Sequence, residues 1–141
     1  CNPLESARLM VRSLGIEQKT LIIDRLIAHQ DMALYYCAAD AVLIPSVEGF
    51  GLVYLEAMAC GVPVIGVAEG ASLEVVGEYA GILAAPGDGL QDRLTNALVR
   101  FYDDQHLRER TAIAALERFQ LRFSHDTYGM ELEALLARWA K

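Results

Sequence analysis

Apolar positions recur at helical spacing at the start of the chain. The residues that share this face are Leu4, Ala7, Leu9, Met10 and Leu14. Gly15 follows them, and a glycine at this place is typical of a helix C-terminus. A second helix is predicted over residues 31–39, with Asp31 as its N-terminal cap and Asp40 at its end.

Four short apolar runs of strand length follow one another with helical segments between them. They cover residues 20–23, 41–45, 62–67 and 81–84. The run 41–45 is uninterrupted and closed by Pro45, which is typical of a strand buried on both faces of a parallel sheet.

The helical segments complete an alternating order of strands and helices. They are expected at residues 52–59, around 73–76, from 90 onward with Leu94, Ala97, Leu98 and Phe101 on one face, from 103 to about 119, and at 126–139. This order predicts an α/β fold with a Rossmann-like parallel sheet and helices on both of its faces. Because such domains generally use five or six strands, we expect one or two further strands upstream of Cys1.

Composition narrows the class of protein. The chain has 141 residues, 54% of them hydrophobic and 22% charged, which suits one globular domain over residues 1–141. The net charge of −7 argues against a nucleic-acid partner. No apolar run approaches the roughly 18 to 20 residues of a membrane span, and residues 1–10 do not read as a signal peptide. Three cysteines without a CxxC pair disfavour zinc and a disulfide framework, so a cytoplasmic location is expected.

Positive charge is absent from the middle of the chain. No Lys or Arg lies between Arg25 and Arg93, whereas nine acidic residues do. A loop of two glycines, Gly49 and Gly51, lies within this stretch, between a predicted strand and helix. The free N–H groups of the helix's first turn and its dipole would form an anion site without a cation. The alternative is that the two glycines only make a tight turn.

Two glutamates bracket this loop. Glu48 precedes it, and Glu56 lies about 7 Å further along the helix axis. Carboxylates accept hydrogen bonds from hydroxyls, so a diphosphate with a hydroxyl-rich ring on each side, that is, a nucleotide sugar, fits the arrangement. Glu56 can also be explained as a solvated helix residue, but its neighbours are apolar, and an isolated acid on a buried helix needs a partner.

The segments 38–46 and 48–65 resemble the donor-binding C-terminal half of retaining GT-B glycosyltransferases of family 4, which carry two glutamates separated by seven residues. The resemblance implies that Glu48 acts at the donor sugar, near the reacting carbon, and that Glu56 binds the ribose hydroxyls. It implies further donor contacts through the backbone of four loop residues: Gly49, Phe50, Gly51 and Leu52. It also implies transfer of a hexosyl group from a nucleoside diphosphate sugar to an acceptor hydroxyl, with no cofactor.

The chain departs from the family at several positions. Arg25 stands where relatives commonly have glycine, so Arg25 and Leu26 are candidates for contacts with the base. The diphosphate-binding Arg and Lys of the family and its acceptor domain are expected upstream of Cys1, and peripheral membrane contact through that domain stays open. The chain has no Asp-x-Asp, so no metal is expected to hold the diphosphate.

Two other functions stay open at this point. One is a non-catalytic Rossmann-like nucleotide-binding module, and the other is an epimerase or phosphorylase of the GT-B architecture. Single histidines and Cys60 are interpreted as surface or packing residues. Ser46 lacks the glycine-flanked turn of hydrolase nucleophiles, which disfavours an esterase.

Overall fold

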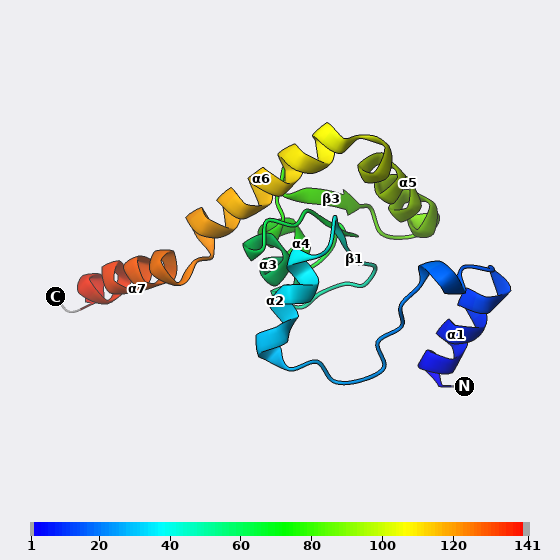
Figure 1. Ribbon diagram of the computed structural model, residues 1–141. Helices are drawn as coiled ribbons and strands as arrows, with labels where there is room; N and C mark the ends of the chain where they lie inside the picture. Colours follow the sequence, from blue (N-terminus) through cyan, green and yellow to red (C-terminus); the bar gives the residue numbers. More distant parts are fainter. Residues whose placement is uncertain (1, 140–141) are drawn as a thin grey trace.

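The computed structural model of the protein describes residues 2–139 and shows a three-stranded parallel sheet (Figure 1). The strands lie in the order β1 (Val42–Ile44), β2 (Val64–Val67) and β3 (Gly81–Ala84). Val42 pairs with Val64, and Val64 pairs with Gly81. Three of the four predicted strands are therefore confirmed, together with the parallel α/β class.

The helices follow the predicted order with small shifts of their ends. They are α1 (Pro3–Ser13), the 3₁₀ helix η1 (Glu17–Lys19), α2 (His29–Cys37), α3 (Leu52–Ala59), α4 (Ala71–Val75), α5 (Leu90–Asp103), α6 (Gln105–Arg122) and α7 (His125–Trp139). Asp104 caps α6, since its carboxylate accepts a hydrogen bond from the backbone N–H of Leu107 at 2.8 Å.

Helices cover both faces of the sheet, as the sequence predicts. All four residues of β2 are buried, and successive side chains point to opposite faces. Val64 packs in a core with residues of α2, α3, α4 and α6, including Tyr36, Met58, Val75 and Ala115. Ile65 packs in a second core with Leu94, Ala97 and Phe101 of α5. The central strand thus separates two hydrophobic layers.

The predicted strand at residues 20–23 is wrong. The chain forms η1 just before it and then runs without regular structure to α2, away from the sheet (Figure 1). Leu21 is 82% exposed, so the apolar run does not enter the core. A strand needs a neighbour for its backbone N–H and C=O groups, and within residues 2–139 this segment has none.

Asp31 is not the cap of α2. The helix begins two residues earlier, at His29, with Ala28 in the N-cap position and no side chain bonded there. Asp31 instead lies in the first turn, where its backbone N–H donates to the carbonyl oxygen of Ala28 at 2.9 Å. A carboxylate in the first turn still interacts favourably with the helix dipole.

β1 is less buried than its apolar sequence suggests. It lies at one edge of the described sheet, and Leu43 is 38% exposed, whereas β2 in the centre is fully buried. An uninterrupted apolar run indicates burial on both faces, but it does not tell a central strand from an edge strand.

Tyr54 ties α3 to the sheet through close packing against glycine. Its side chain is fully buried, and a Cβ on Gly66 of β2 would lie 2.4 Å from the Tyr54 hydroxyl oxygen. Burial is the main cause that raises the pKa of Tyr54, and the negative charge of Glu48 adds to it. The hydroxyl lies near the Val67 backbone but makes no hydrogen bond of normal geometry within residues 2–139.

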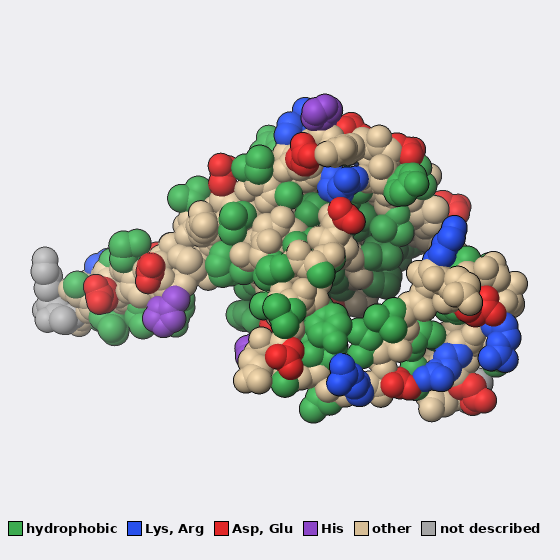
Figure 2. Space-filling model, viewed as in Figure 1, with side chains coloured by type: hydrophobic (Ala, Val, Ile, Leu, Met, Phe, Trp, Pro, Cys, Tyr) green, Lys and Arg blue, Asp and Glu red, His purple; other side chains and the backbone are tan. Residues whose placement is uncertain are grey.

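The C-terminal helix α7 extends from the body as an arm. It follows α6 at the end of the chain and contacts it (Figure 1), and none of its described residues is buried. Several of its hydrophobic side chains are exposed, namely Tyr128, Met130, Leu135 and Leu136. Figure 2 shows hydrophobic side chains on the surface of this arm. Within residues 2–139, no helix is both long and apolar enough to cross a membrane.

Candidate functional site

The glycine loop meets the turn after the neighbouring strand. Glu48 follows β1 and forms a parallel bridge with Gly70, which follows β2. The backbone N–H of Ala71 donates to the carbonyl oxygen of Glu48 at 3.1 Å. Both segments lie at the carboxyl ends of parallel strands, which is where open α/β sheets bind their ligands.

The Glu48 side chain is half-buried and has a fixed polar neighbour. The hydroxyl of Ser46 donates to its Oε1 atom at 2.9 Å. One carboxylate oxygen is therefore bonded within the loop, and Oε2 has no such bond among the described residues. In the sequence Ser46 suggests only a nucleophile, because its hydrogen bond to Glu48 depends on the turn of the loop.

The N-terminus of α3 begins directly at the loop. Gly51, its N-cap, has a left-handed backbone with φ of 81°, a conformation that favours glycine. No side chain caps the helix, so the N–H groups of its first turn are not satisfied by a side chain. With the positive end of the dipole, these groups provide a site for an anion.

Gly49 differs from Gly51 because the fold does not require glycine there. Its φ is not positive, and a Cβ at this position would meet no atom within 4 Å. A tight turn therefore accounts for Gly51 but not for Gly49. The open space at Gly49 is what close approach of a ligand to the backbone would need. The side chains of Phe50 and Leu52 point outward and are 73% and 58% exposed.

A hollow of about 420 Å³ adjoins the loop on the side of α4. Its lining includes Gly49 and Phe50 from the loop, Gly70 and Glu74 from the next turn and helix, and Phe123 from the end of α6. The loop therefore faces open space and is not packed under a neighbouring element.

Glu56 has the partner that its apolar surroundings require. The hydroxyl of Tyr36 on α2 donates to Glu56 Oε2 at 2.8 Å. Burial, followed by the hydrogen bond and the charge of Glu56, raises the pKa of Tyr36 to about 12, so the hydroxyl stays protonated and remains a donor at neutral pH. Sequence reasoning missed Tyr36, because it stands among the apolar residues of α2 and gives no local signal.

The structure does not bring Arg25 and Leu26 to this loop. Both lie in the irregular segment before α2 (Figure 1), and Leu26 is 98% exposed. Arg25 makes no hydrogen bond or ion pair with another described residue. Their contact with a base stays a prediction.

Two arginines that follow the loop in sequence are bound to backbone carbonyls. Arg93 donates to backbone carbonyls of residues 85–88, and Arg118 donates to the carbonyls of Glu74 and Val75. Both guanidinium groups therefore hold the fold together. Across residues 2–139, no group of three His, Cys, Asp or Glu side chains is placed to hold a metal ion.

Known proteins share this fold. Residues 3–118 match the family described as "Glycosyl transferases group 1". Sucrose-phosphate synthase from Thermosynechococcus elongatus superposes with a TM-score of 0.80 at 31% identity, over 96% of this chain and 34% of that one. The C-terminal domain of a glycosyl transferase group 1 family protein from Francisella tularensis superposes with a TM-score of 0.75 at 26% identity, over 86% of this chain and 62% of that one.

Two curated relatives are similar over most of the chain. A D-inositol 3-phosphate glycosyltransferase of Kribbella flavida is 36% identical over 89% of this chain and 28% of its own length. A GDP-mannose-dependent monoacylated alpha-(1-6)-phosphatidylinositol monomannoside mannosyltransferase of Corynebacterium glutamicum is 33% identical over 86% of this chain and 33% of its own length. The chain thus spans about a third of these relatives. Its matched residues and its fold show that it belongs to the group 1 family of glycosyl transferases.

Proposed function

We propose that this chain is the donor-binding domain of a retaining glycosyltransferase that moves a hexosyl group from a nucleoside diphosphate sugar to an acceptor hydroxyl. The observation that carries the proposal is the uncapped N-terminus of α3 with Glu48 before it and Glu56 behind it. An acceptor domain would precede this one in the same protein, and the isolated domain would bind donor without transferring it.

In this proposal the diphosphate rests on the first turn of α3. The N–H groups of Gly51 and of the residues after it donate to phosphate oxygens, and Gly49 lets the backbone come close. Cations from upstream of Cys1 add to this charge. The site needs no divalent metal, because backbone donors and the helix dipole neutralise the leaving group.

Glu48 would act next to the anomeric carbon. A carboxylate at this place stabilises the positive charge of an oxocarbenium-like transition state, whether or not a covalent bond forms. The Ser46 hydroxyl holds Oε1, which orients the carboxylate and leaves Oε2 for the sugar.

Glu56 would bind the ribose. Tyr36 holds its Oε2, so Oε1 is available for ribose hydroxyls. The base and the sugar are open, and the relatives' names place GDP-mannose among the donors to test.

The experiment that tests the proposal is a donor panel. Nucleoside diphosphates and nucleotide sugars, GDP-mannose included, are titrated against the chain by calorimetry, and the full-length protein is assayed for sugar transfer and for phosphate release. We expect one nucleotide sugar to bind and to be transferred with retention. Transfer from a sugar 1-phosphate with release of inorganic phosphate would indicate a phosphorylase, and binding without turnover in the full-length protein would indicate a non-catalytic module.

Replacing Glu56 with alanine should weaken nucleotide binding. A hydrogen bond between a hydroxyl and a charged acceptor contributes roughly 1.5 to 3 kcal/mol, which corresponds to about a 10- to 150-fold rise in Kd. Calorimetry on the full-length protein measures this. Because the alanine variant also leaves the Tyr36 hydroxyl without its acceptor, Glu56→Gln and Tyr36→Phe are measured beside it. Unchanged affinity in Glu56→Ala would remove Glu56 from the site.

The rate of sugar transfer by the full-length protein should be the same with excess EDTA as with added magnesium. The reason is that the proposed diphosphate contacts are N–H groups and cationic side chains, which chelation leaves in place. Initial rates are compared after dialysis against chelator. Loss of activity that added metal restores would show that a metal ion, and not the terminus of α3, neutralises the leaving group.

A further inference from the structure

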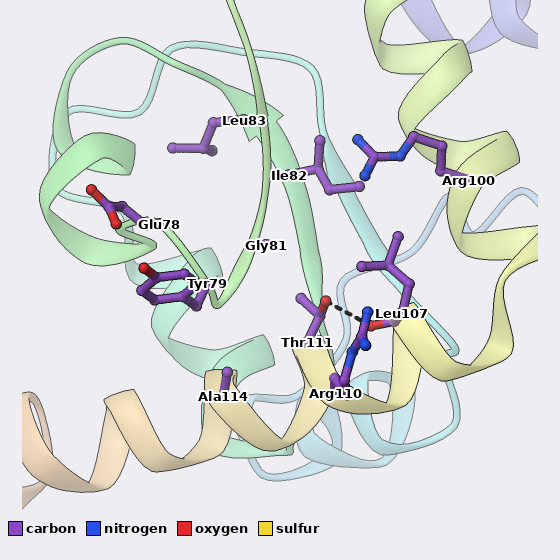
Figure 3. A pocket seen from close by; sticks show the side chains of 10 residues that line it. All are labelled: Glu78, Tyr79, Gly81, Ile82, Leu83, Arg100, Leu107, Arg110, Thr111 and Ala114. Carbon is purple, nitrogen blue, oxygen red and sulfur yellow. Dashed lines mark hydrogen bonds between the residues drawn. The ribbon is translucent and has the colours of Figure 1, made fainter.

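A second cavity lies away from the donor loop, along β3. It has a volume of about 660 Å³ and lies between β3, the end of α5 and the first turns of α6 (Figure 3). It contains none of the residues from Glu48 to Glu56. Its lining includes Gly81, Ile82 and Leu83 of β3 and Leu107 of α6, and its charged residues are Glu78 ahead of β3, Arg100 of α5 and Arg110 of α6.

The cavity runs along the edge of the sheet. Successive side chains of a strand point to opposite faces, as Ile82 and Leu83 do in Figure 3. Three consecutive residues of β3 line this cavity, so it is not confined to one face of the sheet. It therefore follows the edge of the strand. In the described sheet β3 pairs only with β2, so its outer edge has backbone N–H and C=O groups without strand partners.

The two arginines of the cavity are not used by the fold. Arg93, Arg108 and Arg118 all donate to backbone carbonyls. Arg100 and Arg110, in contrast, make no side-chain hydrogen bond or ion pair with another described residue. The charged lining residues are these two arginines and Glu78, so on a chain of net charge −7 the groove is a site of local positive charge.

We propose that this groove binds an acidic segment of a protein partner as an added strand on β3. Strand addition uses backbone hydrogen bonds for affinity and side-chain contacts for selection. Arg100 and Arg110 would bind carboxylates of the segment, and Leu107 and Ile82 would contact its apolar side chains. A second copy of this edge fits less well than an acidic segment, because it offers Glu78 as its one lining carboxylate against the two arginines.

The test is fluorescence anisotropy with labelled peptides and the 141-residue chain. The probe is an octapeptide of alternating Glu and Val, and the matched controls are alternating Lys and Val, and the Glu-Val peptide with two valines replaced by proline. We expect the acidic peptide to bind and each control to bind at least about tenfold more weakly, since the first control reverses the charge and the second removes backbone donors.

Variants of the chain locate the site. Arg100→Gln combined with Arg110→Gln should weaken binding of the acidic peptide by about tenfold or more and reduce its dependence on salt. Arg122→Gln, an exposed arginine of α6 outside the groove, is the control and should bind as the parent does. The proposal would be overturned if the double variant bound the Glu-Val peptide as well as the parent chain does. It would also be overturned if the parent chain bound the proline peptide or the Lys-Val peptide as well as the Glu-Val peptide, or did not bind the Glu-Val peptide at all. Circular dichroism checks that each variant is folded.

Discussion

Glu48→Gln in the full-length protein is expected to lower kcat by about 10²- to 10³-fold, the range seen when one electrostatic contact to a transition state is lost. The amide keeps the size of the side chain and an acceptor for the Ser46 hydroxyl, so the loop should keep its shape. It removes the negative charge, which is needed most when positive charge develops on the sugar.

The measurement separates turnover from donor binding. Donor Kd from calorimetry should change much less than kcat, because the ground-state donor carries little positive charge at the reacting carbon. Glu117→Gln, which removes an exposed acid of α6, serves as the control and should have the parent's turnover. Equal losses in kcat and in affinity would make Glu48 a binding residue only.

Gly81→Ala should destabilise the chain by about 3 kcal/mol, the upper part of the usual range for overpacking. A Cβ at this position would lie 2.3 Å from the carbonyl oxygen of Val64, the residue paired with Gly81 across the sheet. It would also lie 2.7 Å from a methyl carbon of Val64 and 2.9 Å from one of Val76. The backbone oxygen belongs to the central strand and has no room to move.

Urea unfolding followed by circular dichroism measures this change. Gly129→Ala in α7 is the matched control, since its Cβ would meet no atom within 4 Å, and alanine favours a helix over glycine. We expect a midpoint at or slightly above that of the parent for Gly129→Ala and a clearly lower one for Gly81→Ala. Equal midpoints in the two variants would contradict the packing described for β3.

The parts of the fold that could be predicted are those with a local pattern. β2 and α3 are marked by an apolar run, a glycine loop and a glycine stop, all within about 20 residues. The run at residues 20–23 has the same composition as a strand, yet it forms none. The residue types of a segment indicate how readily its backbone adopts an extended conformation. A strand also needs a neighbouring strand to pair with, and no local sequence pattern encodes that neighbour.

The residues of the candidate site also differ in whether the sequence alone could group them. Glu48, Gly51 and Glu56 lie on one continuous segment, so their spacing already places them around one helix N-terminus. Tyr36 comes from another helix, twenty residues earlier, and only the packing of α2 against α3 brings it to Glu56. The groove beside β3 is further from local prediction, because Arg100 and Arg110 come from two helices and meet at a strand edge.

The contact between Tyr54 and Gly66 constrains how this sequence can change over generations. Any side chain at position 66 would collide with the phenol ring, so substitutions there are tolerated only after position 54 has become smaller. A smaller residue at 54, in turn, leaves a cavity until position 66 fills it. The two positions are therefore expected to be epistatic, because the residue at each one determines which mutations the other can accept. A lineage that exchanges one pair of residues at positions 54 and 66 for another would pass through a less stable intermediate.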